Sequence, residues 1–326
     1  MRNFTFKGLF LTAVFMLLGC FSIQAADDDL ITKQITINLD KAGTLPNKIA
    51  SSEMYKITNL KIIGEINGTD WNMIREMAGR DNRGYGTEGK LSVLDLSEAK
   101  IVKGGDSYYS GDNCYTSNDE IGEYAFKDCS RLTSLTLPVG ITSIGYDAFA
   151  YCSGLTSLTL PAGITSIGEY AFSGCSGLTS LTLPAGITSI DKYAFSGCSR
   201  LTSLTLPAGI TSIGEFAFSY CSGLTSIYVY AEKVPRIGRY AFEGCASRKC
   251  TLYVPKGTYD NYRLSEFGYF ENIVEFDATG IDKTTTSTDV EEVSRYSLNG
   301  QRLAVPVKGL NIVKYSDGTA RKVVVK

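Results

Sequence analysis

The middle of the chain, residues 120–250, repeats one pattern of apolar and polar positions. The pattern reads IGEYAFxxCSxLTSLTLPAGITS and returns in phase along this segment. Apolar and polar residues alternate in its LTSLTL portion, which predicts a short strand with Leu135 and Leu137 facing the core. A period of about 20 to 50 residues that is sustained over several units is the signature of a solenoid.

Each predicted strand is followed by a proline and a glycine. Pro138 ends the strand because it lacks the N–H that the ladder needs, and Gly140 favours the turn that follows. The next segment, such as 169–172, suits a single helical turn that buries its Ala and Phe. We therefore predict an α/β, strand-rich leucine-rich-repeat solenoid. It has one short strand and one short helical turn per 23-residue coil, with a parallel β-sheet on one face.

The segment 27–119 lacks the exact repeat but keeps the same kinds of element. Alternating runs at 34–39 and 60–66 predict strands, and 91–96 carries the LxxLxL spacing. Asp70 is placed to cap the helix that follows it. We predict an N-terminal cap with degenerate repeats, because an open solenoid end would expose apolar core.

The residues after the repeats divide into three predicted parts. Residues 251–279 are expected to form a C-terminal cap that closes the other end of the core. A polar run of Thr and Ser within 280–290 predicts a linker. Short apolar runs between turn residues then predict a small β module at 291–326.

Residues 1–26 have the pattern of an export signal. Arg2 and Lys7 precede an apolar run, and small residues follow near Ala25. The sequence LLGC that ends at Cys20 also fits a bacterial lipoprotein cleavage box, with Cys20 as the acylated residue. Both interpretations predict export, to the medium or to the outer cell surface. A membrane contact is expected only through such a lipid anchor.

Composition removes several classes of function. The chain has no histidine, which excludes imidazole bases, Ser-His-Asp and Cys-His nucleophile systems and histidine metal ligands. Its net charge of −2 provides no field that favours nucleic acid. The sequence contains no phosphate-binding glycine loop and no nucleophile elbow. We predict a protein that is not an enzyme and has no cofactor and no metal.

A ladder of six cysteines marks the repeat. Neighbouring members are separated by 23, 23, 23, 23 and 24 residues, so each coil supplies one thiol at an inward position. Metal sites need clustered thiolates, whereas a single buried Cys packs as a small apolar side chain. We interpret the ladder as structural, with disulfides between some members, or between Cys245 and Cys250, as an alternative. The ladder comprises Cys129, Cys152, Cys175, Cys198, Cys221 and Cys245.

The outward residues of the predicted strands form two rows of mostly hydroxyl side chains. The simpler interpretation is that small polar residues solvate the sheet face. A binding interpretation exists because solenoid sheets serve as extended docking surfaces. Tyr228 and Tyr230 interrupt the pattern with large rings, which makes the last coils the stronger candidate for contact. The rows are Ser134, Ser157, Ser180, Ser203 and Ser226, and Thr136, Thr159, Thr182, Thr205 and Tyr228.

A third candidate surface lies just before the Ala-Phe pair of each coil, where the sequence varies most. We expect the aromatic residues there to half-bury against the next coil rather than bind a ligand. The pairs are Glu123-Tyr124, Tyr146-Asp147, Glu169-Tyr170, Lys192-Tyr193, Glu215-Phe216 and Arg239-Tyr240.

The recurring IGxxAFxxCxxLxxLxLP, first seen from Ile121 to Pro138, resembles the BspA-like class of leucine-rich repeats. The segments 71–79 and 252–276 are similar to the entry and closing parts of such proteins. The last residues resemble a short form of the sorting domain of the type IX secretion route.

This resemblance implies a non-catalytic adhesin on the surface of a bacterium or secreted by it. Proteins of the class are associated with binding to host extracellular-matrix proteins such as fibronectin and fibrinogen. Protein ligands are therefore the expected partners. A structural lattice or glycan binder that uses the Ser/Thr rows is the alternative.

Overall fold

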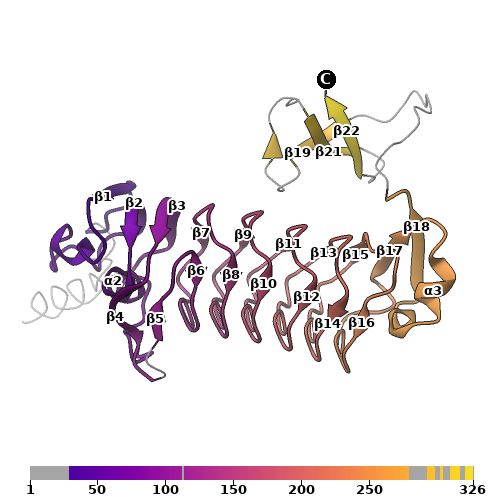
Figure 1. Ribbon diagram of the computed structural model, residues 1–326, viewed down its shortest axis with the longest axis horizontal. Coiled ribbons are helices and arrows are strands. Elements are labelled where there is room, and N and C mark those ends of the chain that lie inside the picture. Colours follow the sequence, from indigo (N-terminus) through magenta and orange to yellow (C-terminus); the bar gives the residue numbers. More distant parts are fainter. Residues whose placement is uncertain are drawn as a thin grey trace, which may run out of the picture.

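The computed structural model contains a long solenoid and a separate small sheet (Figure 1). The predicted signal peptide at 1–26, Cys20 within it and the predicted linker at 280–290 lie outside the described residues. Within the part that is described, no helix is long and apolar enough to cross a membrane. The described residues are 29–111, 114–278, 292–297, 302–303, 309–315 and 320–325.

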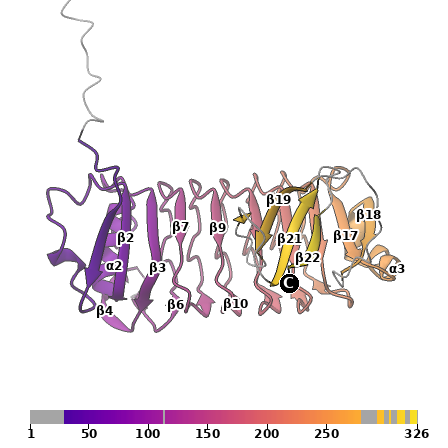
Figure 2. The same ribbon diagram turned by 90° about the horizontal axis from the view of Figure 1, so that it is seen from above.

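Ten parallel strands form one face of the solenoid, which confirms the predicted fold. Leu135 pairs with Leu158, and Leu181 with Leu204, so the same buried position recurs from rung to rung. Seen from above, the strands lie side by side along the axis (Figure 2). The first group is β1 (Ile35–Leu39), β2 (Asn59–Ile66), β3 (Val93–Ile101), β7 (Ser134–Thr136) and β9 (Ser157–Thr159); the second is β11 (Ser180–Thr182), β13 (Ser203–Leu206), β15 (Ser226–Val229), β17 (Thr251–Pro255) and β18 (Asn272–Phe276).

Each repeat coil contains a second short strand that the sequence interpretation missed. In the four central coils it lies after a Pro-x-Gly turn. In each coil one polar and one apolar residue of this strand pair with their equivalents in the neighbouring coil. Two residues are too few to show a period of two, so the pattern could not reveal it. These strands are β6 (Glu120–Ile121), β8 (Ser143–Ile144), β10 (Ser166–Ile167), β12 (Ser189–Ile190), β14 (Ser212–Ile213) and β16 (Arg236–Ile237).

The segment predicted as a helical turn is not helical, so that part of the prediction was wrong. The first repeat coil passes here through two residues with positive φ, Tyr124 (57°) and Asp128 (61°), which a right-handed helix does not contain. Alternate N–H groups bond forward to the next coil: Tyr124 donates to the Tyr146 carbonyl at 2.9 Å and Phe126 to Ala148 at 2.7 Å. The five coil junctions contain fifteen such bonds, all with the donor on the N-terminal coil. We call this array the turn ladder.

The core is a stack of identical side chains contributed by successive coils. Phe149 and Phe172 are fully buried, with ring centroids 5.0 Å apart and planes at 4°. Burying one such side chain contributes about 1.5–3 kcal/mol before chain entropy is subtracted. A coil can bury its Phe only against neighbours, so the array and its two ends are stabilised together.

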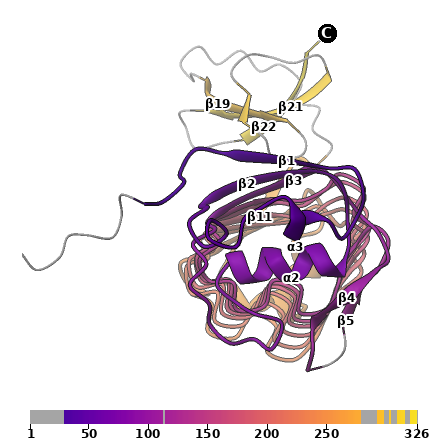
Figure 3. The same ribbon diagram turned by 90° about the vertical axis from the view of Figure 1, so that its left-hand side faces the viewer.

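The helix α2 (Gly68–Met77) covers the N-terminal end of the core (Figure 3). Asn67 is its N-cap: the Asn67 side chain accepts from Thr69 N–H, and the Asp70 carboxylate accepts from Asn67 N–H. The prediction that Asp70 is the N-cap was therefore wrong. Asp70 lies at the third helical position, where it also accepts from Leu45 N–H. Packed against α2 are η1 (Leu45–Asn47) and β4 (Gly104–Tyr109), which pairs with β5 (Cys114–Thr116).

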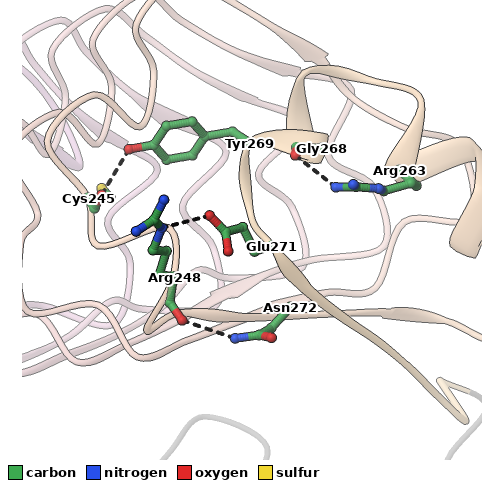
Figure 4. A network of polar contacts seen from close by, with 7 residues as sticks. All are labelled: Cys245, Arg248, Arg263, Gly268, Tyr269, Glu271 and Asn272. Carbon is green, nitrogen blue, oxygen red and sulfur yellow. Dashed lines mark hydrogen bonds and ion pairs between the residues drawn. The ribbon is translucent and has the colours of Figure 1, made fainter.

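The C-terminal end is covered by a short polar and aromatic cap (Figure 4). The Tyr269 hydroxyl donates to the Cys245 carbonyl at 2.9 Å, and Arg248 Nε lies 3.0 Å from a Glu271 carboxylate oxygen. Arg248 is 84% exposed, so this ion pair contributes little. The elements of this cap are α3 (Tyr259–Arg263), η2 (Glu266–Tyr269) and β18.

The last described residues form a four-stranded antiparallel sheet in the order β20-β19-β21-β22. The buried guanidinium of Arg295 donates to the side-chain oxygen of Asn311 at 3.3 Å. The sequence predicted short strands here, and a sorting role for them stays a prediction. The strands are β19 (Glu292–Ser297), β20 (Arg302–Leu303), β21 (Gly309–Tyr315) and β22 (Ala320–Val325).

Candidate binding surfaces

The cysteine ladder lies in the core and forms hydrogen bonds between coils. The Cys152 thiol donates to the Phe126 carbonyl at 3.0 Å, and Cys175 donates to Phe149 at 3.0 Å. The six ladder cysteines and Cys250 are free and buried, and within the described residues no group of three or more Cys, Asp or Glu could hold a metal ion. The same bond joins Cys198 to Phe172, Cys221 to Phe195 and Cys245 to Phe218.

Burial raises the pKa of several of these thiols. It raises the pKa of Cys129 to about 11 and that of Cys250 to about 12. It also raises the pKa of Cys152 and Cys175 well above the usual value. Because the thiolate is the nucleophile and the metal ligand, the ladder acts at neutral pH as packing and as a set of weak donors.

The Ser/Thr rows lie on the sheet face in register. Ser157 and Thr159 flank the buried Leu158 and pair with Ser134 and Thr136 of the preceding coil. The central members of the rows and Thr136 are exposed, whereas Ser134 and the members nearer the C-terminus are half-buried. Exposed are Ser157, Thr159, Ser180 and Thr182, while Ser134, Ser203, Thr205 and Ser226 are half-buried.

A neighbouring row of threonines has a structural role that the sequence interpretation missed. The Thr156 hydroxyl donates to the Thr133 carbonyl at 3.1 Å, and the Thr202 hydroxyl donates to Thr179 at 2.9 Å. Each of these hydrogen bonds joins one coil to the coil before it. The sequence shows only that Thr and Ser stand next to each other at the start of each strand. This pattern does not distinguish a hydroxyl that bonds to the neighbouring coil from one that faces solvent.

Tyr228 and Tyr230 pack within the C-terminal cap. Tyr228 stacks on Tyr253 with centroids 4.5 Å apart, and Tyr230 meets Phe276 edge-on at 5.1 Å. Burial raises the pKa of both hydroxyls. The two rings that the sequence analysis proposed as a ligand contact therefore pack largely against aromatic residues of the same chain.

The aromatic residues before the Ala-Phe pairs form a continuous ladder along the outer edge of the coils. Tyr170 and Tyr193 stack 4.6 Å apart at 5°, and Phe216 follows at 4.8 Å. The rings are half-buried against their neighbours until the last, Tyr240, which is 58% exposed. This outer aromatic ladder consists of Tyr109, Tyr124, Tyr146, Tyr170, Tyr193, Phe216 and Tyr240.

One coil reverses the order of its two residues in this ladder. Tyr146 stands where other coils have a polar or charged residue, and Asp147 stands in the position of the ring and is buried. Lys127 compensates, because its ammonium lies 2.6 Å from the Asp147 carboxylate and 5.0 Å from the Tyr124 ring centroid. The Lys127 cation thus lies against the Tyr124 ring, and Tyr146 continues the ladder through edge contacts with Tyr124 and Tyr170.

The N-terminal end of the turn ladder is closed by side chains of the cap. Trp71 Nε1 donates to the Ala125 carbonyl at 3.0 Å, and Arg75 donates to the same oxygen at 3.0 Å. The Tyr108 hydroxyl donates to the Glu123 carbonyl at 3.0 Å. These oxygens would accept from a preceding coil, and the cap supplies the missing donors.

Arg75 also closes the N-terminal end of the outer aromatic ladder. Its guanidinium lies 5.4 Å from the centroid of the Tyr109 ring, which stacks on Tyr124 at 4.6 Å. Arg75 is fully buried and donates only to backbone carbonyls, including that of Tyr124 at 2.6 Å. No sequence motif marks this role, because the acceptors are main-chain oxygens about fifty residues away.

Residues 119–249 match the family described as BspA type leucine rich repeat region, in 6 copies. No curated protein matches the chain. Among solved structures, a leucine rich repeat protein of T. pallidum is 28% identical, with 49% of this chain and 76% of that chain covered and a TM-score of 0.39. A leucine rich cell surface protein of Faecalibacterium prausnitzii is 23% identical, with 68% and 51% covered and a TM-score of 0.34. The pneumococcal vaccine antigen PcpA is 16% identical, with 75% and 66% covered and a TM-score of 0.37.

The matched segment coincides with the six coils that carry the cysteine ladder and the outer aromatic ladder. Residues 119–249 therefore belong to the BspA-type leucine-rich repeats, and the chain is built around a leucine-rich-repeat solenoid.

Proposed function

We propose that the protein is exported and acts without catalysis, by binding protein ligands through the surface of its solenoid. The repeat family suggests a non-catalytic interaction role. The observation that carries the proposal is the outer aromatic ladder, which places a partly exposed ring in each of six coils, five of them tyrosines. Tyrosine combines apolar area with a hydrogen-bonding group and loses little entropy on binding.

Host matrix proteins such as fibronectin and fibrinogen are the ligands we propose, at the cell surface or in the medium. The test is solid-phase binding of the mature chain to immobilised fibronectin and fibrinogen, with serum albumin as the control. Saturable binding to either matrix protein above the albumin level supports the proposal. Binding equal to that on albumin contradicts it.

A lattice or glycan binder is the second candidate, and the register of the Ser/Thr rows favours it. Ser157 and Thr159 repeat Ser134 and Thr136 at one strand spacing, about 4.8 Å, so the exposed hydroxyls form a regular array. Co-sedimentation with crystalline chitin and cellulose, together with thermal hysteresis, tests this function. A Thr159→Val/Thr182→Val variant should lose binding. Equal binding by this variant and the wild type would contradict a role of the Ser/Thr rows in lattice or glycan binding.

A further inference from the structure

The turn ladder is polar along the solenoid axis. In all fifteen of its bonds the N–H belongs to one coil and the carbonyl to the coil that follows. Its N-terminal end therefore presents carbonyl oxygens, and its C-terminal end presents N–H groups. The cap at the N-terminal end supplies donors to two of the three acceptor carbonyls of the first coil: Trp71 and Arg75 donate to Ala125, and Tyr108 donates to Glu123.

The C-terminal end has no corresponding acceptors within the described residues. The N–H groups in the forward-donating positions of the last coil belong to Tyr240, Phe242 and Gly244, and none of them has a hydrogen-bond partner there. The Phe242 ring is covered by Phe267 and Phe270. Tyr240 and Gly244, on either side of it, are exposed.

The outer aromatic ladder is open at the same place. One face of Tyr240 packs against Phe216, with centroids 5.1 Å apart. Within the described residues no further ring or cation lies against Tyr240, whereas Arg75 covers the opposite end of the ladder at Tyr109. Gly244 has φ of 73° and no side chain, so nothing of its own shields its N–H group.

We propose that this end of the solenoid binds an extended peptide segment of a protein ligand as one further rung. Carbonyl oxygens of the segment accept from the Tyr240 and Gly244 N–H groups, and an aromatic side chain stacks on Tyr240. Edge addition of this kind draws affinity from main-chain bonds and specificity from the side chain. The proposal rests on the proposed function, since it names the docking mode of a protein ligand.

The chain itself supplies the probe. A fluorescein-labelled peptide copying residues 213–224, with Ser in place of Cys221, carries the carbonyls and the ring that a further coil would present. We expect it to bind the mature chain in fluorescence anisotropy and to shift the Gly244 amide resonance in ¹⁵N-glycine-labelled protein. A scrambled peptide of the same composition should do neither.

Two variants with equally exposed tyrosines test the location. Tyr240→Ser should weaken peptide binding about tenfold, as expected for loss of a stacked ring. Tyr151→Ser removes a ring that is 56% exposed in an interior coil and should leave binding unchanged. Circular dichroism melts of both variants verify that the fold is kept.

Equal binding of the two peptides, or equal loss in the two variants, would overturn the inference. So would peptide binding that leaves the Gly244 amide unmoved. Matrix-protein binding that survives Tyr240→Ser would leave the proposed function standing and this docking mode refuted. Peptide binding without matrix-protein binding would support the docking mode and refute the proposed ligands.

Discussion

The two ends of the solenoid are closed in different ways. At the N-terminal end, buried side chains of α2 and β4 donate to main-chain oxygens of the first repeat coil. At the C-terminal end, Phe267 and Phe270 cover the last core ring, but the forward-pointing N–H groups of Tyr240 and Gly244 have no partner in the part of the chain that is described. The terminal core ring is thus covered at both ends, since Trp71 lies against Phe126. Within the described residues, only the N-terminal cap forms hydrogen bonds to the main chain of the turn ladder.

This difference follows from the polarity of the repeat. Identical coils that donate in one direction leave acceptors at one end and donors at the other, so no single cap sequence can serve both. Unsatisfied buried carbonyls cost about 1–3 kcal/mol each, which accounts for a buried tryptophan, arginine and tyrosine in the N-terminal cap. Exposed N–H groups can bond to water, and they stay available to a ligand.

The largest change in the free energy of unfolding is expected from raising the pH. A high pH ionises thiols of the core, which the two caps cover. Burial raises the pKa of Cys129 to about 11, above the value of about 8.5 for an unfolded chain. The stability from such a thiol is full below pH about 8.5 and is lost as the pH rises toward 11. Each thiol whose pKa burial raises in this way should lower the free energy of unfolding by about 1.4 kcal/mol per pH unit in this range. Because several coils contain such a thiol, we expect the array to unfold as the pH rises.

Urea titrations at pH 8, 9 and 10 measure this dependence. The free energy of unfolding should fall less steeply with pH in Cys152→Ala than in the wild type. The difference is the contribution of one thiol, because burial also raises the pKa of Cys152. A slope that does not change in this variant would contradict the assignment to buried thiols.

Paired arginine variants compare the two ends directly. Arg75→Leu should lower the free energy of unfolding by about 2–3 kcal/mol, because the carbonyls of Tyr124 and Ala125 lose their charged donor. Arg248→Leu at the other end should change it by less than about 0.5 kcal/mol, since its ion pair is exposed. Urea unfolding monitored by circular dichroism measures both, and equal losses would break the contrast.

A milder pair removes one hydrogen bond at each end and keeps the ring. Tyr108→Phe should cost about 1–2 kcal/mol, because the Glu123 carbonyl loses the donor that this buried side chain supplies. Tyr269→Phe removes the bond to the Cys245 carbonyl from a ring that is 46% exposed, and should cost about 0.5 kcal/mol. The same titrations give both values. A larger cost at Tyr269 would argue that the C-terminal cap carries polar closure after all.

The sequence predicted the solenoid because its period is long and its apolar positions recur in phase. Leu135 and its equivalents are buried and their Ser and Thr neighbours lie on the sheet face, as alternation required. The turn segment was predicted wrongly, because Tyr124 and Asp128 adopt positive φ that their side chains do not favour. Bonds to the next coil hold them there, and these bonds join residues about 22 positions apart.

The candidate surfaces were harder to predict, because they too depend on contacts between residues far apart in the sequence. Tyr228 and Tyr230 stood out as large rings, yet β17 and β18 bring Tyr253 and Phe276 against them. Arg75 gave no signal, because its acceptors are main-chain carbonyls of a distant coil. A local pattern reports which face a residue occupies, and only the stacking of coils decides what lies against it.

Hydrogen exchange of individual amides tests the unequal closure of the two ends most directly. The Tyr124 and Asp128 amides donate to the next coil, whereas their equivalents Tyr240 and Gly244 do not. Exchange followed by NMR at neutral pH should show Tyr124 and Asp128 protected at least about a hundredfold over an unstructured chain. Tyr240 and Gly244 should exchange near the unstructured rate. Equal protection of the two pairs would contradict the account.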